Sequence, residues 1–225
     1  MTTILENLQG VKARIARASQ AAGREVASVT LLAVSKAHAV EKVAAASATG
    51  HNAFGENYVQ EALVKMDALP GLEWHLIGPL QSNKAAVVAE RFQWMQTLDR
   101  LKIANRLSDH RPAHLPALNL LIQVNISAEP RKSGVAADEV APLAEQVARL
   151  PRLRLRGLMA IPAPGHQTDF AKMKVLYDEL RDAFGFDTLS MGMSDDLEAA
   201  ITHGSTMVRI GTAIFGQRKT NKAMP

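Results

Sequence analysis

Lys36 is the residue whose type and position point most directly to chemistry. It follows Thr30–Val34, an apolar segment whose length and branched side chains are typical of a buried strand, with Ser35 between them. Burial lowers the pKa of an amine from its usual value of ~10.4 and makes it a nucleophile. Lys36 is therefore a candidate for Schiff-base chemistry. The alternative is a lysine that extends from a strand end into solvent, and this segment alone favours that alternative.

Two later segments carry groups that suit a phosphate. Ser194 follows a predicted strand and precedes a predicted helix, and helix N-termini attract anions through their N–H groups. The alternative is that Ser194 only caps this helix, and spacing alone does not separate the two. Gly211 ends the last predicted strand, and Thr212 follows it. Barrels often bind phosphate with the loops after strands seven and eight, so the pair of loops favours a phosphate site.

Arg209 and His75 are the other candidates. Arg209 lies within the last predicted strand, where a buried guanidinium stays charged and needs a partner. That partner is either an acidic side chain of the protein or a group of a ligand. The ligand group would be an anion or a ring nitrogen. His75 could act as a base, but a lone histidine in a strand is more often a hydrogen-bonded core residue. No second histidine or acid lies at ligand spacing from it, so we predict no metal site.

These groups follow strands in an alternating pattern of strands and helices. No linker divides the chain, so we predict one domain over residues 1–225. Eight strands alternating with helices indicate a closed (β/α)8 TIM barrel, with function at the carboxyl ends of the strands. A capping box of Thr3 and Glu6 begins an extra N-terminal helix. The predicted strands are 30–34, 52–55, 73–78, 94–97, 118–126, 153–161, 187–190 and 207–211. The predicted helices are 3–22, 40–49, 58–68, 84–90, 101–109, 137–150, 169–184 and 195–203.

Composition narrows the class of protein. The chain has 225 residues, 47% of them apolar, and no cysteine, which excludes disulfides and thiolate chemistry. We expect a cytoplasmic protein, because no signal peptide or membrane span is evident. The net charge is +4, but charges of both signs are mixed and aromatic residues make up only 4%. We therefore expect neither a nucleic-acid nor a membrane partner.

A nucleophilic lysine, two phosphate loops and an arginine together match pyridoxal 5′-phosphate (PLP). Lys36 would hold PLP as an internal aldimine, and the loops would hold its phosphate. Arg209 beside the pyridine nitrogen would keep that nitrogen unprotonated, which limits the ring as an electron sink.

Seven stretches together resemble the pyridoxal phosphate homeostasis protein family, the YggS/PROSC type of alanine-racemase-like barrel. They are LAVSK (32–36), FGENY (54–58), WHLIGPLQSNK (74–84), KSG (132–134), GLM (157–159), LSMGMSDD (189–196) and VRIGTAIFG (208–216). The resemblance extends from Leu5 to Gly216 and implies the PLP fold type III barrel. It implies PLP on Lys36, with Asn57 lining the pocket and Arg209 near the ring nitrogen. It also implies that Ser194, Gly211 and Thr212 hold the phosphate.

The family's properties set the functional expectations. Its members are mostly monomers without established catalytic turnover, which are thought to buffer PLP or deliver it, a role in which apo-forms of PLP-dependent enzymes are possible partners. Two places depart from the family: His38 replaces a second lysine found in many bacterial relatives, and the tail 218–225 diverges.

Two alternatives to a carrier remain open. One is a slow amino-acid racemase with His75 or Lys36 as its base. Related racemases use a second β-rich domain and a tyrosine from a dimer partner, and we expect no room for that domain here. Neither Tyr58 nor Tyr177 follows a late strand end. The other alternative is a barrel that binds a sugar phosphate without PLP.

Overall fold

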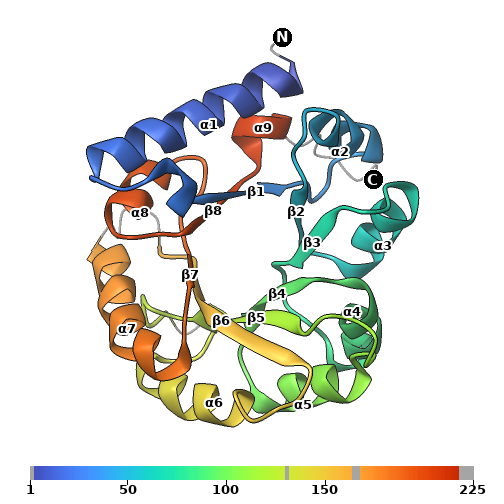
Figure 1. The fold of residues 1–225 in the computed structure, drawn as a ribbon, viewed down its shortest axis with the longest axis vertical. Helices are drawn as coiled ribbons and strands as arrows, with labels where there is room; N and C mark the ends of the chain where they lie inside the picture. The colour runs from blue at the N-terminus through green and yellow to red at the C-terminus, as the bar shows by residue number, and fades with distance from the viewer. Residues whose placement is uncertain (1–2, 130–131, 164–167, 218–225) are drawn as a thin grey trace, which may run out of the picture.

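The structure is a computed structural model that describes residues 3–129, 132–163 and 168–217. Eight parallel strands form a closed barrel in chain order, with helices around it (Figure 1). The first and last strands close the barrel, in a register from Thr30 opposite Met207 to Ala33 opposite Ile210. The strands are β1 Thr30–Val34, β2 Ala53–Glu56, β3 Glu73–Leu76, β4 Trp94–Leu98, β5 Leu118–Val124, β6 Leu153–Ala160, β7 Thr188–Ser190 and β8 Met207–Ile210. The predicted (β/α)8 barrel is confirmed.

Helices surround the barrel, and most lie where the sequence predicts them. They are α1 Ile4–Ala21, α2 Val40–Ser47, α3 Val59–Ala68, α4 Ala85–Arg91, α5 Leu101–His110, α6 Val140–Val147, α7 Thr168–Phe184, α8 Leu197–Thr202 and α9 Thr212–Phe215. The helix predicted over 137–150 divides into a 3₁₀ turn, Ala137–Glu139, and α6. Helix α9 was not predicted, because four residues are too few for a helical period to be visible.

The extra N-terminal helix α1 lies across the outside of the barrel beside α8 and α9 (Figure 1). The predicted capping box is present: Glu6 N–H donates to Thr3 Oγ1 (3.2 Å), and Thr3 N–H donates to Glu6 Oε2 (2.7 Å). Helix α1 also donates from Asn7 Nδ2 to Ile214 O (2.8 Å) and from Arg14 Nη2 to Ser194 O (2.9 Å). The helix therefore supports, from outside, the two loops predicted to hold phosphate.

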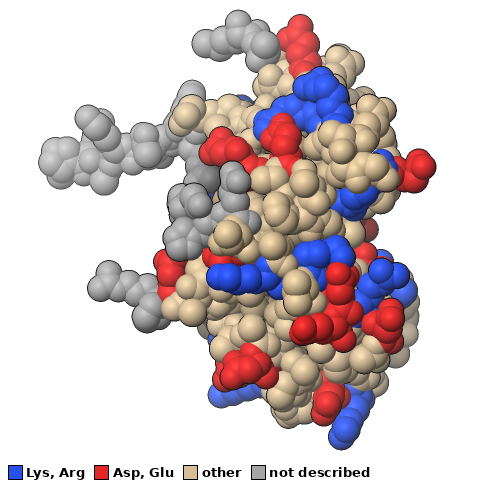
Figure 2. All heavy atoms as spheres, turned by 90° about the vertical axis from the view of Figure 1, so that its left-hand side faces the viewer, with Lys and Arg blue, Asp and Glu red and all other residues tan. Residues whose placement is uncertain are grey.

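The surface carries charges of both signs. On the face drawn in Figure 2, lysine and arginine side chains lie next to aspartate and glutamate side chains. Ion pairs such as Arg14 with Glu198 (2.7 Å) and Arg156 with Asp187 (2.7 Å) contribute to this mixing. Within the described ranges, the helices include none with the length and apolar character to span a membrane.

Candidate cofactor site

A pocket at the carboxyl ends of β1 and β8, which we call the Lys36 pocket, brings the predicted site residues together. It has a volume of about 210 Å³. Its lining includes all six predicted cofactor residues: Lys36, Asn57, Ser194, Arg209, Gly211 and Thr212. Val34, Ile77 and Ile161 add apolar wall. Residues at the ends of six strands, β1, β2, β3, β6, β7 and β8, thus meet in a space suited to a small ligand with one ring.

The two predicted phosphate loops meet within the Lys36 pocket. Ser194 belongs to the loop after β7, and its Oγ lies 3.4 Å from the N–H of Ala213 in α9. Ser194 does not cap α8, because α8 begins at Leu197 and Asp196 precedes it. The capping alternative is therefore wrong. Ser194 and Thr212 both line the pocket, and a hydroxyl group can donate to an anion.

Arg209 is a buried cation with neutral partners. Its side chain comes from β8, and the residue is 4% exposed. Nη1 donates to Ser190 Oγ (2.7 Å), and Nη2 donates to the carbonyl of Ala160 (2.9 Å). Burial lowers the pKa of Arg209 to about 10, and nearby Asp196 opposes this shift, so the group stays charged at neutral pH. Among the described residues, no carboxylate lies within 4.0 Å of it, so the ion-pair alternative does not hold.

Asn57 lines the same pocket and carries a buried acceptor with no partner among the described residues. It follows β2, and its Oδ1 is buried with no hydrogen-bond partner among the described residues. The backbone here passes close to the end of β3, since a Cβ placed on Gly78 would lie 2.1 Å from Asn57 O. A donor on a ligand, or a water molecule, would satisfy this buried oxygen.

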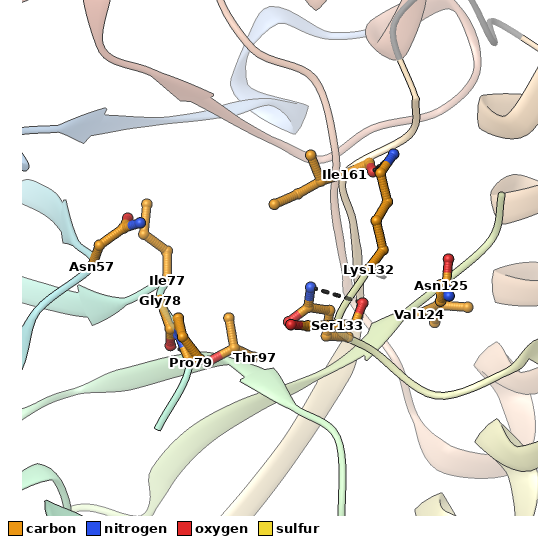
Figure 3. Close-up of a pocket in the computed structure, with 11 residues that line it drawn as sticks. Asn57, Ile77, Gly78, Pro79, Thr97, Val124, Asn125, Lys132, Ser133 and Ile161 are labelled. Carbon is orange, nitrogen blue, oxygen red and sulfur yellow. Dashed lines mark hydrogen bonds between the residues drawn. The ribbon is translucent and has the colours of Figure 1, made fainter. Parts of the chain in front are cut away.

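A second pocket of about 310 Å³ adjoins the first and shares Asn57, Ile77 and Ile161 with it (Figure 3). Its far wall carries polar groups that the sequence analysis did not select, namely Thr97, Gln123, Asn125 and Ser133. Lys132, from one of the matching stretches, lies beside Ile161 in Figure 3 and pairs with Glu129 Oε1 (2.9 Å). The Lys36 pocket is therefore one end of a larger depression that has polar walls and includes both pockets.

Two buried charges and one partly exposed carboxylate hold the backbone on both sides of Lys36. We call Lys65, Glu56 and Glu61 the Lys65 cluster. Lys65 is 3% exposed on α3, and its Nζ donates to Glu56 Oε1 (2.7 Å), Glu61 Oε1 (2.7 Å) and the Ser35 carbonyl (2.8 Å). Ser35 Oγ donates to Glu56 Oε1 (2.6 Å). The cluster therefore fixes the residue that precedes Lys36.

The residue after Lys36 is held by the same cluster. Ala37 N–H donates to Glu61 Oε1 (2.6 Å), and Ala37 adopts φ of 60°, a left-handed conformation that is unfavourable for alanine. Burial raises the pKa of Glu56, while Lys65 and Ser35 oppose this shift. The sequence analysis missed this cluster. Its only signal is Glu61 four residues before Lys65, which is also the pattern of an ordinary surface ion pair.

His75 is a core residue, as the sequence analysis favoured. It is fully buried, stacks on Trp94 with ring centroids 5.0 Å apart, and is not among the residues lining the Lys36 pocket. Its Nε2 lies 2.8 Å from Glu73 Oε1. Burial lowers the pKa of His75 below its usual 6.5, against the opposing effect of Glu73.

This shift predicts a loss of stability in mild acid. Between the folded pKa and 6.5, the unfolded chain binds a proton at His75 that the folded chain does not. The free energy of unfolding should therefore fall as the pH drops below 6.5, and His75→Gln should flatten that fall. Urea unfolding at several pH values measures it, with the exposed His114→Gln as the control. Equal slopes in all three proteins would contradict the assignment.

His38, one of the two departures from the family, contacts helix α9. His38 is buried, with its ring 5.2 Å from the ring of Phe215. Lys42 Nζ donates to the Phe215 carbonyl (2.6 Å) beside it. The divergent tail 218–225 lies outside the described residues. Within the described ranges, no three histidine or acidic side chains gather as a metal site would require.

Comparison with known proteins agrees with this geometry. Residues 7–219 match the family model of the alanine racemase N-terminal domain. A Pseudomonas aeruginosa protein named pyridoxal phosphate homeostasis protein is 56% identical, with 97% of each chain covered. The Escherichia coli K12 protein of that name is 54% identical over 99% of this chain and 100% of its own. The chain belongs to the pyridoxal phosphate homeostasis protein family.

Solved structures of family relatives have the same fold. PipY of Synechococcus elongatus, solved with PLP bound, is 33% identical and superposes with a TM-score of 0.81 over 95% of this chain and 100% of that chain. An alanine racemase of Clostridium difficile has a TM-score of 0.76 over 96% of this chain but 58% of its own, at 13% identity. The second likeness concerns the fold alone.

Proposed function

We propose that this protein binds PLP in the Lys36 pocket, with covalent attachment through Lys36 Nζ, and acts in PLP homeostasis by buffering or delivering the cofactor. The observation that carries the proposal is that all six predicted cofactor residues line this one pocket. PLP bound to PipY, a 33% identical relative, supports the same ligand.

The residues of the pocket fit the groups of PLP. The hydroxyls of Ser194 and Thr212, with Gly211 between the strand and α9, would hold the phosphate. Arg209 would face the ring nitrogen, and the anionic cofactor would supply the negative charge that Arg209 lacks among its present partners. The buried Asn57 Oδ1 would accept from a donor on the ligand or on a bridging water. When bound, PLP supplies an aldehyde and an electron-withdrawing ring.

Several observations favour a carrier over an enzyme. Racemisation needs proton-transfer groups near the ligand. His75 is sealed in the barrel core and Tyr58 is 65% exposed, while Tyr177 donates to Phe186 O (3.1 Å). None of these three lines the Lys36 pocket, so of the bases considered in the sequence analysis only Lys36 is at the site. The adjoining second pocket leaves the site open to small molecules, which suits release of the cofactor and suits exclusion of water poorly.

Transfer of the cofactor is the direct test of this function. The protein loaded with PLP is mixed with the apo-form of a PLP-dependent enzyme, with and without a scavenger of free aldehyde. We expect the apo-enzyme to gain activity in both cases if delivery is direct, and only without scavenger if the protein acts as a buffer. Failure of this protein to bind PLP would contradict both direct delivery and buffering. Turnover of L-alanine to D-alanine faster than free PLP would favour the racemase alternative. We expect a monomeric, cytoplasmic protein in this role.

Thr212→Ala tests the phosphate assignment. Loss of one hydrogen bond to an anion should weaken PLP binding by about 1–3 kcal/mol. Equilibrium titration with PLP measures the change. Thr202→Ala on α8 is the matched control, because its hydroxyl donates to Glu198 O (3.0 Å) outside the pocket. Equal affinity for PLP in the two variants would show that Thr212 does not bind the phosphate.

A further inference from the structure

A chain of hydrogen bonds crosses the inside of the barrel from Arg209 to the opposite mouth. Arg209 Nη1 donates to Ser190 Oγ (2.7 Å), and Ser190 Oγ donates to Gln96 Oε1 (2.7 Å). Gln96 Nε2 lies 2.9 Å from His75 Nδ1, and His75 Nε2 lies 2.8 Å from Glu73 Oε1. Ser190, Gln96 and His75 are fully buried. The chain links strands β8, β7, β4 and β3 through side chains alone.

The observed contacts give every bond in this chain one direction. A guanidinium only donates, so Ser190 Oγ accepts from Arg209 and gives its own proton to Gln96. The Gln96 oxygen therefore faces Ser190, and its amide nitrogen, which only donates, faces His75 Nδ1. Nδ1 must then be the unprotonated nitrogen, and Nε2–H donates to Glu73. All donors point from Arg209 toward Glu73.

The opposite direction would leave a buried group unsatisfied. With a proton on His75 Nδ1, the Gln96 amide would have to turn over and donate to Ser190 Oγ. Ser190 Oγ would then receive protons from both Gln96 and Arg209, and its own hydroxyl proton would lose the Gln96 acceptor. A buried polar group left unpaired is costly, so the observed direction is favoured. Burial, which lowers the pKa of His75, also favours the neutral ring.

Glu73 anchors the far end of the chain at the amino-terminal mouth of the barrel. Its side chain is 40% exposed and lines a small pocket there with Trp94 and Arg156. Met207 Sδ is the other neighbour of Gln96 Nε2, at 3.1 Å, and is a weak acceptor. The two ends of the chain are therefore charged: the Glu73 carboxylate accepts from His75, and the Arg209 guanidinium donates to Ser190. Gln96 links the two halves.

We propose that Gln96 is a positioning residue for the cofactor: through Ser190 it holds the Arg209 guanidinium in the orientation that meets the ring nitrogen of PLP. The inference rests on the proposed function, since it assigns Arg209 to the cofactor. It adds that residues which never touch the ligand, and lie on the far side of the barrel, determine how firmly the ligand is held. Within the described ranges, the Arg209 guanidinium donates to Ser190 Oγ and Ala160 O, so loosening Ser190 leaves it one of these two hydrogen bonds.

The test compares two substitutions of glutamine by methionine. Gln96→Met keeps the length of the side chain and removes the link to Ser190. The control, Gln93→Met, removes the hydrogen bond that Gln93 Oε1 accepts from Trp74 N–H (2.8 Å), but does not touch the chain to Arg209. We expect PLP to dissociate about tenfold faster from Gln96→Met than from the native protein, and the absorbance spectrum of bound PLP to change. Gln93→Met should match the native protein in both.

Two further measurements keep the proposal falsifiable. Ser190→Ala breaks the same chain with a smaller change of volume, and should reproduce the faster dissociation if Gln96→Met does not fold. Nitrogen-15 NMR of the apo-protein should place the His75 proton on Nε2. If Ser190→Ala, or a folded Gln96→Met, has the native dissociation rate and spectrum, the inference is overturned but the proposed function stands. A proton on His75 Nδ1 would have the same consequence. A native protein that does not bind PLP would overturn both.

Discussion

Lys36→Ala is expected to abolish the visible absorbance that PLP acquires on this protein, while the fold stays intact. Lys36 lies in the turn after β1, and its side chain reaches the pocket that Arg209, Ser194 and Thr212 also line. Alanine removes the amine that would bond to the aldehyde, but leaves the groups that would hold the phosphate and ring. PLP should therefore still bind, more weakly and reversibly, without the absorbance of a protein-linked cofactor.

The matched control is Lys102→Ala, which removes an exposed lysine from α5, away from the pocket. It should retain the native spectrum. Far-ultraviolet circular dichroism and thermal unfolding of the apo-proteins report on the fold. If Lys36→Ala keeps the native absorbance, another amine carries the cofactor. If it unfolds the barrel, Lys36 has a structural role instead.

Lys65→Met is expected to lower the free energy of unfolding by about 3–5 kcal/mol, the range typical of a broken buried ion pair. Methionine fills the space of the buried alkyl chain but leaves Glu56, which is fully buried, without its cation. An unpaired buried carboxylate is costly, because protein interiors solvate charge poorly. The Ser35 carbonyl also loses its donor, so the turn that presents Lys36 should loosen and PLP affinity should fall.

A double variant separates these two effects. Lys65→Met with Glu56→Gln removes the unpaired charge, and should recover much of the stability because the buried pair becomes neutral. It does not restore the donor to the Ser35 carbonyl, so PLP affinity should stay below that of the native protein. Lys102→Met should change the free energy of unfolding by less than about 0.5 kcal/mol. A fully native affinity in the double variant would show that the Lys65 cluster serves stability alone.

The barrel and the residues at its strand ends were largely predictable from local patterns. Apolar runs closed by polar residues placed the ends of β1 and β8, and the rule that function lies at carboxyl ends then selected Lys36, Arg209 and Gly211. The resemblance to a family added Asn57. Boundaries were less accurate where turns intervene, and α8 begins at Leu197 rather than at Asp195.

Groups that depend on contacts between distant strands could not be predicted. Gln96 and Ser190 are separated by 94 residues, and only the closure of the barrel places their side chains 2.7 Å apart. Lys65 resembles a surface lysine in sequence, because the burial of α3 against the barrel is a tertiary property. Periodicity describes each element by itself, while the register of eight strands decides which side chains meet.

The central claim, that PLP is joined to Lys36, is tested most directly by chemical trapping. The protein loaded with PLP is reduced with borohydride, digested, and its peptides are mapped by mass spectrometry. We predict that the pyridoxyl group is found on the peptide containing Lys36 and that it is absent when Lys36 is alanine. Recovery of an unmodified Lys36 peptide, with the label elsewhere or nowhere, would contradict the account.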